Sequence, residues 1–476
     1  MKLFELLGEK SGEFSEITIK GVTNNSSAVK DGFVFVCIKG VSNDGHDFAK
    51  DAAEKGAAVI IAERDLGLEN QIIVDDTRKA YALMCAKWFG EPAKKLKMLG
   101  VTGTNGKTSV SYMLKAILEK AGHKTGLIGT IQNMIGDTVI SSKNTTPDAY
   151  ALHEMLASMV KDGCECCVME VSSHALDQDR VYGIKYEVAM FTNLTQDHLD
   201  YHKTMENYCR AKRRLFEQCN TAVVNFDDKY TNELIGGLDC RVVTYSAESD
   251  ESTYSAKEIT YRPDGIMYHF VGYNLIGRIK MSTGGKFSVY NSMCAVSAAA
   301  ELGIPLEIAA KAIAEIKGVK GRAEVVPTGR DFTVIIDYAH TPDGLKNILS
   351  TFKEFEKTRL IAVFGCGGDR DKTKRPKMGK IAAEIADFVI VTSDNPRTED
   401  PIAIIDDILV GMKDSKTPYK VIPDRISAIN FAIQNAEKDD IIVLAGKGHE
   451  TYQILKDKTI HLDEREIVAD ALARLS

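Results

Sequence analysis

Several features that would place this chain in other classes are missing. No apolar run reaches membrane-spanning length, and the first residues, MKLFELLGEKSGEF, lack the form of a signal peptide. Excess positive charge is also missing, because the formal net charge is −7, which argues against an electrostatic nucleic-acid binder. No internal repeat or low-complexity segment occurs. We therefore expect a cytoplasmic protein of about two to four domains, with no nucleic-acid partner and no membrane insertion.

Paired cysteines are missing as well. Of the ten cysteines, Cys164, Cys166 and Cys167 cluster, but within the apolar run CECCVMEV rather than in CxxC units. The other seven are scattered along the chain. We expect reduced, mostly buried thiols and no cysteine metal site.

What the sequence does contain is a glycine-rich segment between a strand and a helix. Residues 99–101 predict the end of a buried strand, and SVSYMLKAILEKAG, from Ser109 onward, has the apolar spacing of an amphipathic helix. Gly103 and Gly106 lie between them, and glycines allow backbone N–H groups to approach a phosphate at a helix N-terminus. The sequence therefore predicts a phosphate-binding loop.

Two side chains at the end of this loop add to that prediction. Lys107 can reach the terminal phosphates of a nucleotide, and Thr108 can offer its hydroxyl to Mg²⁺. The spacing departs from the common Walker pattern, because Val101 stands where that pattern has its first glycine. The alternative is a glycine-rich turn with an exposed lysine.

Three α/β segments follow one another along the chain. Residues 1–97 predict a small α/β domain, and residues 98–328 predict a central domain with a parallel or mixed sheet of the phosphate-loop type. Residues 329–476 contain four buried strands that alternate with helices, which predicts a doubly wound, Rossmann-like sheet. We therefore expect an α/β protein of three domains.

Polar clusters follow several of the predicted strands in the central segment. Because the carboxyl ends of parallel strands meet at one edge of a sheet, three such clusters beside a phosphate loop predict a catalytic cleft. The clusters contain Glu170, Ser172, Ser173, His174, Gln178 and Arg180; Asn193, Asp197, His198, Asp200 and His202; and Asn225, Asp227 and Asp228.

Within these clusters, Glu170 and His198 are candidate Mg²⁺ ligands beside Thr108. Glu170 could instead cap a turn, and His198 could be a hydrogen-bonded loop histidine. Lys212, in YCRAKRRLFEQ, is by composition a solvated lysine on a helix.

In the last segment, Arg370 and Arg397 follow adjacent strands. Arginine pairs bidentately with carboxylates, so the two residues near Glu450 would suit a substrate with carboxylate and ammonium groups. Phosphate binding or structural ion pairs are the alternatives.

Eight motifs occur in order over nearly the whole chain: GTNGKT, MEVSSH, TNLTQDHLDYH, AKRRLF, DYAHTPD, GCGGDRDKTKRP, DNPR and GKGHETYQ. Together they resemble the Mur ligases, the ATP-dependent amide-forming enzymes of bacterial peptidoglycan assembly. The resemblance implies three domains, which bind the uridine diphosphate part of the substrate, ATP with Mg²⁺, and the incoming amino acid. It also implies that Lys212 is carbamylated by CO₂, and so can help to hold a second Mg²⁺.

Site residues are carried over from the resemblance by matching motifs. The catalytic set is Lys107, Glu170, His198 and Lys212, and the metal set is Thr108, Glu170, His198 and Lys212 as its carbamate. The ATP set is Gly103, Thr104, Asn105, Gly106, Lys107, Thr108, Ser109, Asn291, Arg322, Asp337 and His340. The muramoyl-substrate set is Ser26, Asn144, Thr145, Thr146, Ser172, Gln178 and Arg180. The amino-acid set is Arg370, Asp394, Asn395, Pro396, Arg397, Gly446 and Glu450.

The implied reaction has two steps. ATP phosphorylates the D-glutamate γ-carboxylate of UDP-N-acetylmuramoyl-L-alanyl-D-glutamate, and the amine of an amino acid then attacks the acyl phosphate. The run Asp394–Arg397 resembles the run found in members that add meso-diaminopimelate. Arg397 would pair with the second carboxylate of that amino acid, so we expect meso-diaminopimelate to be the acceptor. We also expect a monomer with a hinge near residue 329, because the outer domains must close.

One departure and three alternatives accompany this prediction. The run Asn25–Gly32, NSSAVKDG, keeps Ser26 but lacks the acidic, arginine and proline residues usual in the family, which leaves uridine binding open. The alternatives are a lysine-adding ligase, a folylpolyglutamate-synthetase-like ligase, and a nucleotide-binding protein without catalysis.

Overall fold

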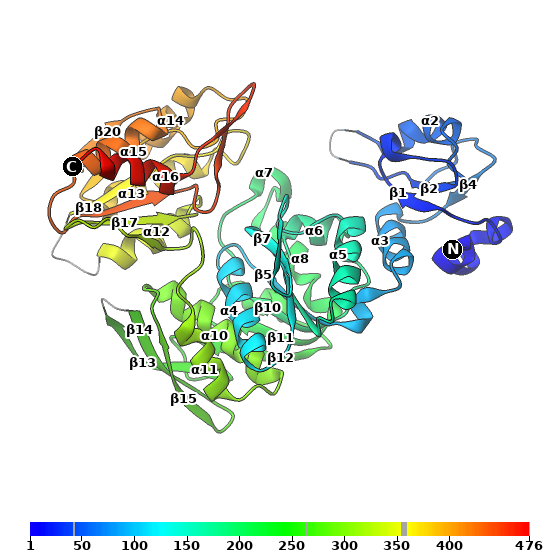
Figure 1. The fold of residues 1–476 in the computed structure, drawn as a ribbon, viewed down its shortest axis with the longest axis horizontal. Helices are drawn as coiled ribbons and strands as arrows, with labels where there is room; N and C mark the ends of the chain where they lie inside the picture. Colours follow the sequence, from blue (N-terminus) through cyan, green and yellow to red (C-terminus); the bar gives the residue numbers. More distant parts are fainter. Residues whose placement is uncertain (41–42, 263–264, 354–358, 476) are drawn as a thin grey trace.

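The computed structural model describes residues 1–40, 43–262, 265–353 and 359–475. Three large sheets follow one another along the described residues, each accompanied by helices, and β22 and β23 form a small two-stranded sheet in the last unit. The N-terminal unit (blue in Figure 1) and the C-terminal unit (yellow to red) lie on opposite sides of the central one. The predicted α/β class is confirmed.

The N-terminal unit is built on a parallel sheet in the order β1-β2-β3-β4. Its β-branched strands bury Val34, Val36, Val59 and Ile61 in a core shared with helix α3. The elements are α1 (Leu3–Leu7), η1 (Gly8–Phe14), β1 (Gly21–Thr23), η2 (Ser26–Ala28), β2 (Phe33–Val36), η3 (Gly45–Phe48), α2 (Ala49–Glu54), β3 (Val59–Ala62), β4 (Gln71–Ile73), α3 (Thr77–Trp88) and η4 (Pro92–Lys95).

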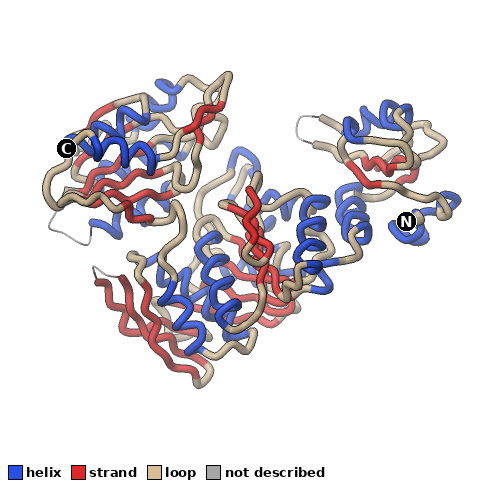
Figure 2. The backbone as a smooth tube through the Cα atoms, in the orientation of Figure 1, coloured by secondary structure: helices blue, strands red, loops and turns tan. Residues whose placement is uncertain are grey.

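The central unit is built on a mixed sheet in the order β15-β14-β13-β12-β11-β10-β5-β9-β6-β7-β8. Its middle strands are parallel, and antiparallel strands extend both edges. Figure 2 shows β13–β15 grouped at one side of the unit. The strands are β5 (Lys97–Thr102), β6 (Thr125–Ile128), β7 (Gln132–Ile135), β8 (Thr138–Ser141), β9 (Cys166–Glu170), β10 (Tyr186–Phe191), β11 (Cys219–Asn225), β12 (Arg241–Ser246), β13 (Tyr254–Arg262), β14 (Gly265–Gly272) and β15 (Leu275–Met281).

Helices cover both faces of this sheet. Val110, Leu114 and Ile117 of α4 bury one face together with α10 and α11, and Leu152 and Leu156 of α5 bury the other. Each such side chain contributes roughly 1.5–3 kcal/mol of burial free energy. The helices are α4 (Lys107–Lys120), α5 (Ala149–Lys161), α6 (Ser173–Asp177), α7 (Leu199–His202), α8 (Met205–Arg213), η5 (Phe216–Gln218), α9 (Thr231–Ile235), α10 (Lys286–Glu301) and α11 (Leu306–Glu315).

The order of the parallel strands determines where a ligand can bind in the central unit. Strand β5 lies between β9 and β10, so the chain passes from one side of β5 to the other after β9. Such a change of direction opens a crevice beyond the carboxyl ends of the strands. The glycine-rich segment follows β5 at this point.

The C-terminal unit has the sheet order β16-β17-β21-β18-β19-β20, in which only β16 is antiparallel. Leu345, Ile348 and Met378 lie in the core on one face, and Ile429 and Val468 in the core on the other. The elements are β16 (Glu324–Val326), β17 (Thr333–Asp337), α12 (Pro342–Lys353), β18 (Leu360–Phe364), α13 (Lys374–Ile385), β19 (Phe388–Val391), α14 (Pro401–Val410), β20 (Tyr419–Val421), α15 (Arg425–Gln434), β21 (Ile441–Ala445), β22 (Tyr452–Ile454), β23 (Thr459–His461) and α16 (Glu464–Ala473).

The structure refines several details of the sequence prediction. Helix α4 begins at Lys107, two residues before the predicted start at Ser109, so the lysine lies in the first helical turn. Strand β16 precedes residue 329 yet pairs with the third sheet. All ten cysteines are free thiols, as predicted. Among the described residues, no helix combines the length and apolar character needed to cross a membrane.

Candidate functional site

The glycine-rich loop leaves β5 and enters α4 with little room for side chains. Gly106 has a φ of +88°, and a Cβ there would lie 2.3 Å from Asn291 Oδ1. A Cβ on Gly103 would lie 1.8 Å from Thr192 Oγ1. Both positions therefore require glycine, and the loop amides and the N-terminus of α4 together form a site for an anion.

Two lysines point at the same backbone oxygen of this loop. Lys107 Nζ donates to the carbonyls of Gly103 and Thr104, each at 2.9 Å, and Lys212 Nζ donates to Gly103 O, also at 2.9 Å. Lys212 is 1% exposed, and its ammonium also lies 4.4 Å from the ring centre of Tyr208. Burial, and then the charge of Lys107, hold the pKa of Lys212 well below its usual value.

Glu170, at the end of β9, is fully buried beside the loop. Its Oε2 accepts hydrogen bonds from Thr108 Oγ1 at 3.1 Å and Thr130 Oγ1 at 2.8 Å, and its Oε1 accepts one from Thr130 N at 3.0 Å. The turn-capping alternative for Glu170 therefore has some basis, because the carboxylate does bind a turn amide. The same bonds place a carboxylate and the Thr108 hydroxyl side by side.

His198 lies at the start of α7 in the left-handed conformation, with a φ of +54°. Its Nε2 lies 3.4 Å from Asp197 Oδ2, and its ring packs edge-on against His174 with 4.8 Å between centroids. Burial lowers the pKa of His198, which favours the neutral ring with a free lone pair.

The donor set of Thr108, Glu170 and His198 suits a hard divalent cation. Within the part of the chain that the structure describes, no three His, Cys, Asp or Glu side chains gather closely enough to hold a metal ion by themselves. Mg²⁺ commonly binds one or two carboxylates together with the phosphates of a substrate. The residues fit a cation that arrives with a nucleotide better than a permanently bound one.

A cavity of about 490 Å³ opens in front of the loop, between the central and C-terminal units. Asn291, Arg322, Asp337 and His340, which were predicted for the nucleotide, all line this cavity together with the loop. Arg322 Nη2 donates to Thr108 Oγ1 at 3.1 Å, which brings the segment just before β16 to the start of α4. Glu170 and His198 line it as well.

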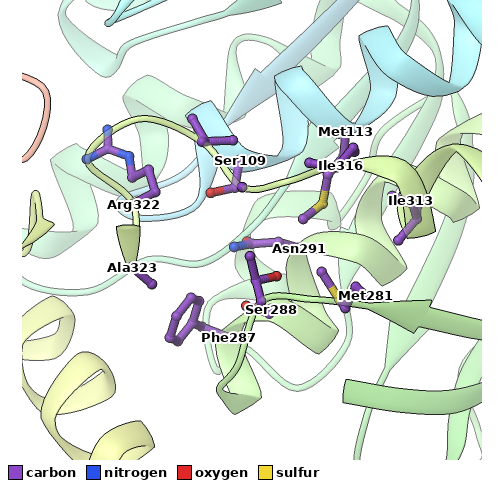
Figure 3. A pocket seen from close by; sticks show the side chains of 13 residues that line it. Ser109, Met113, Met281, Phe287, Ser288, Asn291, Ile313, Ile316, Arg322 and Ala323 are labelled. Carbon is purple, nitrogen blue, oxygen red and sulfur yellow. The ribbon is translucent and has the colours of Figure 1, made fainter. Parts of the chain in front are cut away.

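A small apolar recess of about 20 Å³ adjoins this cavity. In Figure 3, Met113, Ile313 and Ile316 gather at one end of the recess, and Arg322 lies at the other end near Ser109. Asn291 lies between them and lines both spaces. The recess has room for about one water molecule, and it marks where the apolar core under α4 meets the polar site.

The residues predicted for the muramoyl substrate form one network next to Glu170, apart from Ser26 and Asn144. Thr146 Oγ1 donates to Glu170 O at 2.9 Å and accepts from Ser172 N at 3.0 Å. Arg180 donates to Thr146 O at 3.0 Å and to Gln178 Oε1 at 2.6 Å. Thr145 contacts Thr130, and Asn144 O accepts from Ser142. Ser26 lies in η2 of the N-terminal unit, where its carbonyl accepts from Lys55.

The predicted amino-acid residues meet at the carboxyl ends of β18, β19 and β21. Burial is the main cause that lowers the pKa of Arg397, and the positive charge of the nearby Arg370 is the second. Neither guanidinium forms an ion pair with any described residue; they donate to the carbonyls of Asp369 and Gly368. The ion-pair alternative is therefore not supported, and both groups can receive an anion.

Contacts from the C-terminal unit reach the same cleft. Gln196 donates to Asp371 at 3.0 Å and Thr373 at 2.8 Å, and Asp197 lies 3.7 Å from both Lys374 and His340. Tyr338 lines the nucleotide cavity and its hydroxyl lies 3.4 Å from Glu450 Oε1. Tyr338 therefore links the nucleotide cavity to the amino-acid residues.

Several residues of the site received no role from the sequence. Thr130 makes two bonds to Glu170 but belongs to no motif, and nothing in the sequence marks it. Asp197 was noted only as a polar strand end, although it faces His198, His340 and Lys374. Lys447 also received no role, although it lies inside the GKGHETYQ motif, and that motif could have drawn attention to it.

Three family models match the chain. The Mur ligase family catalytic domain matches residues 18–87, the Mur ligase middle domain residues 101–299, and the Mur ligase glutamate ligase domain residues 321–448. A curated protein of Clostridium perfringens, UDP-N-acetylmuramoyl-L-alanyl-D-glutamate–2,6-diaminopimelate ligase, is 47% identical, with 96% of each chain covered. A protein of the same name from Bacillus cereus is also 47% identical, covering 95% of this chain and 94% of its own.

Solved structures agree with these matches. One, titled as the structure of UDP-N-acetylmuramoyl-L-alanyl-D-glutamate–2,6-diaminopimelate ligase, superposes with a TM-score of 0.72 and 32% identity. It covers 100% of this chain and 99% of its own. The MurF ligase of Thermotoga maritima, solved in complex with ADP, shares the fold with a TM-score of 0.65 at 20% identity, over 96% of this chain and 98% of its own.

Proposed function

The chain belongs to the Mur ligase family, and from this premise we propose the reaction that its site carries out. It is an ATP-dependent, ADP-forming ligase of peptidoglycan precursor synthesis. It joins an amine of meso-diaminopimelate to the D-glutamate γ-carboxylate of UDP-N-acetylmuramoyl-L-alanyl-D-glutamate. The observation that carries this choice is the pair of guanidiniums, Arg370 and Arg397, which have no ion-pair partner among the described residues. Glu450 is among the charges that act on Arg397.

The phosphate loop holds ATP in this proposal. The amides from Gly103 to Ser109 and the N-terminus of α4 receive the phosphate oxygens. Lys107 exchanges its two carbonyl partners for the transferring phosphoryl group, where its charge stabilises the transition state. Asn291, Arg322, Asp337 and His340 complete the nucleotide cavity.

Thr108, Glu170 and His198 would hold Mg²⁺ on the same side of the loop. When bound, the cation supplies positive charge that offsets the phosphate oxygens. Thr130 orients the Glu170 carboxylate through its amide and its hydroxyl. These bonds keep the buried carboxylate in place before a nucleotide arrives.

Lys212 is proposed to carry a carbamate. A buried lysine next to Lys107 gains by exchanging its positive charge for a negative one. The neutral amine adds to CO₂, forming an N–C bond and releasing one proton, and the product is a carboxylate that can serve a second Mg²⁺.

The chemical sequence is two-step. The γ-phosphoryl group moves from ATP to the γ-carboxylate and leaves ADP. The amine of diaminopimelate then attacks the acyl carbon, a tetrahedral intermediate forms, and phosphate leaves. Thr146, Ser172, Gln178 and Arg180 position the muramoyl substrate beside Glu170.

The acceptor preference follows from charge. One carboxylate and one ammonium are common to all amino acids, and the second carboxylate of diaminopimelate needs a further cation. Arg370 and Arg397 supply positive charge at that end, whereas L-lysine would bring an ammonium there. Burying a charge opposite a like charge costs a few kcal/mol, or roughly a hundredfold in kcat/KM.

The remaining assignments belong to this proposal as well. The predicted domain bounds are 1–97, 98–328 and 329–476, with closure about a hinge near residue 329. Because β16 (Glu324–Val326) already pairs with the third sheet, we place this hinge before β16. The protein acts in the cytoplasm as a monomer on its three small-molecule substrates. The altered run Asn25–Gly32 changes how the uridine is held without touching the ATP site.

Phosphate release from ATP tests the proposal. The assay contains UDP-N-acetylmuramoyl-L-alanyl-D-glutamate and either meso-diaminopimelate, L-lysine or no amino acid. Release with diaminopimelate alone is the expected result. Release with L-lysine instead would keep the ligase and overturn the acceptor, and no release with either would support a nucleotide-binding protein without catalysis.

A further inference from the structure

A fully buried lysine lies at the centre of the amino-acid pocket. Lys447, directly after Gly446, is 0% exposed. We propose that Lys447 is a positioning residue for the acceptor amino acid, acting by fixing the Asn395 amide and the Glu450 carboxylate in one orientation. The inference rests on the proposed function, because those two residues are the ones assigned to the acceptor.

The ammonium of Lys447 makes two hydrogen bonds and one ion-pair contact. It donates to Asn395 Oδ1 at 2.7 Å and to Glu450 Oε2 at 3.0 Å, and it lies 3.5 Å from Asp394 Oδ1. Two of its three N–H donors are therefore used in hydrogen bonds to residues of the amino-acid set. Because Lys447 is fully buried behind these residues, it acts through its neighbours.

The first consequence concerns the Asn395 amide. Its Oδ1 accepts from Lys447 and from Ile454 N at 2.9 Å, and its Nδ2 donates to Glu450 Oε2 at 3.0 Å. Two donors on Oδ1 prevent the amide from flipping, because a flip would place Nδ2 against both of them. The second Nδ2 hydrogen stays available for an acceptor carboxylate.

The second consequence concerns Glu450. Its Oε2 is taken by Lys447 and Asn395, whereas its Oε1 has, among the residues that the structure describes, only the long contact of 3.4 Å from Tyr338 Oη. Oε1 is thus the oxygen left to receive the ammonium of an amino acid. The side that carries this oxygen also faces Tyr338, which lines the nucleotide cavity.

Charge balance gives the third consequence. Asp394 and Glu450 bring two negative charges and Lys447 one positive charge, so the cluster keeps a surplus of one negative charge. That surplus matches a substrate ammonium, and Arg370 and Arg397 match its carboxylates. Without Lys447 the two carboxylates would repel each other and Asn395 would lose its fixed orientation.

The test compares Lys447→Met with Lys456→Met in steady-state assays of the full-length protein. Lys456 is an exposed lysine of the same unit and serves as the matched control. For Lys447→Met we expect KM for diaminopimelate to rise about 10- to 100-fold, with KM for ATP and for the muramoyl substrate within about threefold. Lys456→Met should match the wild type. An unchanged KM for diaminopimelate in folded Lys447→Met overturns the inference, as does an equal rise in all three KM values.

A double-mutant cycle keeps the test decisive if Lys447→Met folds poorly. Lys447→Met combined with Glu450→Gln removes one positive and one negative charge, so the cluster keeps its surplus of one negative charge. Because part of the effect of Lys447 passes through Glu450, we expect the double variant to raise KM for diaminopimelate above that of Glu450→Gln by less than the 10- to 100-fold expected for Lys447→Met alone. A KM that multiplies the two single effects contradicts the inference. Product formed by the wild type in the same assay separates a failure of this inference from a failure of the proposed function.

Discussion

Lys212 and Lys447 are both buried lysines, 1% and 0% exposed, in two regions of the same cleft. Lys212 faces a backbone carbonyl, a tyrosine ring and the neighbouring Lys107. Lys447 faces an amide oxygen and two carboxylates. Both side chains are buried to the same degree, but Lys447 has carboxylates beside it, whereas the contacts of Lys212 are neutral and its neighbour Lys107 is a second cation.

The difference teaches that burial alone does not decide what a lysine does. A buried ammonium without an anion is costly, and the pKa of Lys212 is held well below its usual value first by burial and then by Lys107. Such an amine has a lone pair for CO₂. Lys447 instead neutralises carboxylates and organises them, which is the role of an ion-paired cation.

The largest expected effect comes from Lys212→Met, which removes the amine and keeps the apolar stem. We expect kcat for amide formation to fall about a thousandfold or more, because the site loses a charge that the transition state needs. Urea unfolding should show an unfolding free energy equal to or above that of the wild type. A variant that unfolds more easily would mean that Lys212 is a stabilising cation, and the comparison would fail.

The same substitution at Lys447 should have the opposite effect on stability. Lys447→Met leaves Asp394 and Glu450 without their cation, and we expect the unfolding free energy to fall by about 3 kcal/mol. Urea unfolding followed by circular dichroism measures this directly. Equal stability of the two Lys→Met variants would remove the distinction between the two regions.

His153 extends the comparison of the two lysines to a buried base that has no hydrogen-bond partner among the described residues. His153 of α5 is 1% exposed, neither ring nitrogen has a hydrogen-bond partner among the described residues, and burial lowers its pKa to about 4. The unfolded chain takes up this proton near pH 6.5 and the folded chain does not, so stability is lost as pH falls from about 6.5 towards 4. At pH 5 this histidine lowers the free energy of unfolding by about 2 kcal/mol relative to pH 8.

His153→Leu should therefore weaken the acid sensitivity of the protein. Between pH 8 and pH 5, we expect the free energy of unfolding of the variant to fall by about 2 kcal/mol less than that of the wild type. Identical pH dependence of the two proteins would show that His153 is not a source of the acid loss.

The smallest effect is expected where a lysine is exposed. Lys456→Met should leave both kcat and the urea midpoint at their wild-type values, because its side chain is solvated. A clear change in either quantity would show that the effects at the buried positions do not depend on burial.

The sequence predicted the elements that periodicity and motifs mark. Strand β5 and the loop from Gly103 lie where the pattern placed them, and the last unit has buried parallel strands that alternate with helices, as predicted. The start of α4 was placed late, because a helix that begins directly at a glycine N-cap has no Ser, Thr or Asp signal. The hairpin β22–β23, which covers Asp394 and Asn395, is too short to leave a pattern.

The site was less predictable than the fold. The structure brings the loop, Asn291, Arg322, Asp337 and His340 to one cavity, although they come from distant segments. Only the resemblance had grouped them, because spacing along the chain says nothing about which strand ends meet. Thr130 and Lys447 gain their importance from tertiary contacts, which no local pattern encodes.

The most direct test of the whole account is the identity of the product. Wild-type protein is incubated with ATP, Mg²⁺, UDP-N-acetylmuramoyl-L-alanyl-D-glutamate and an equal mixture of meso-diaminopimelate and L-lysine, and the nucleotide products are weighed by mass spectrometry. The account predicts one new product, with the mass of the diaminopimelate adduct. A lysine adduct, or no new nucleotide at all, would contradict it.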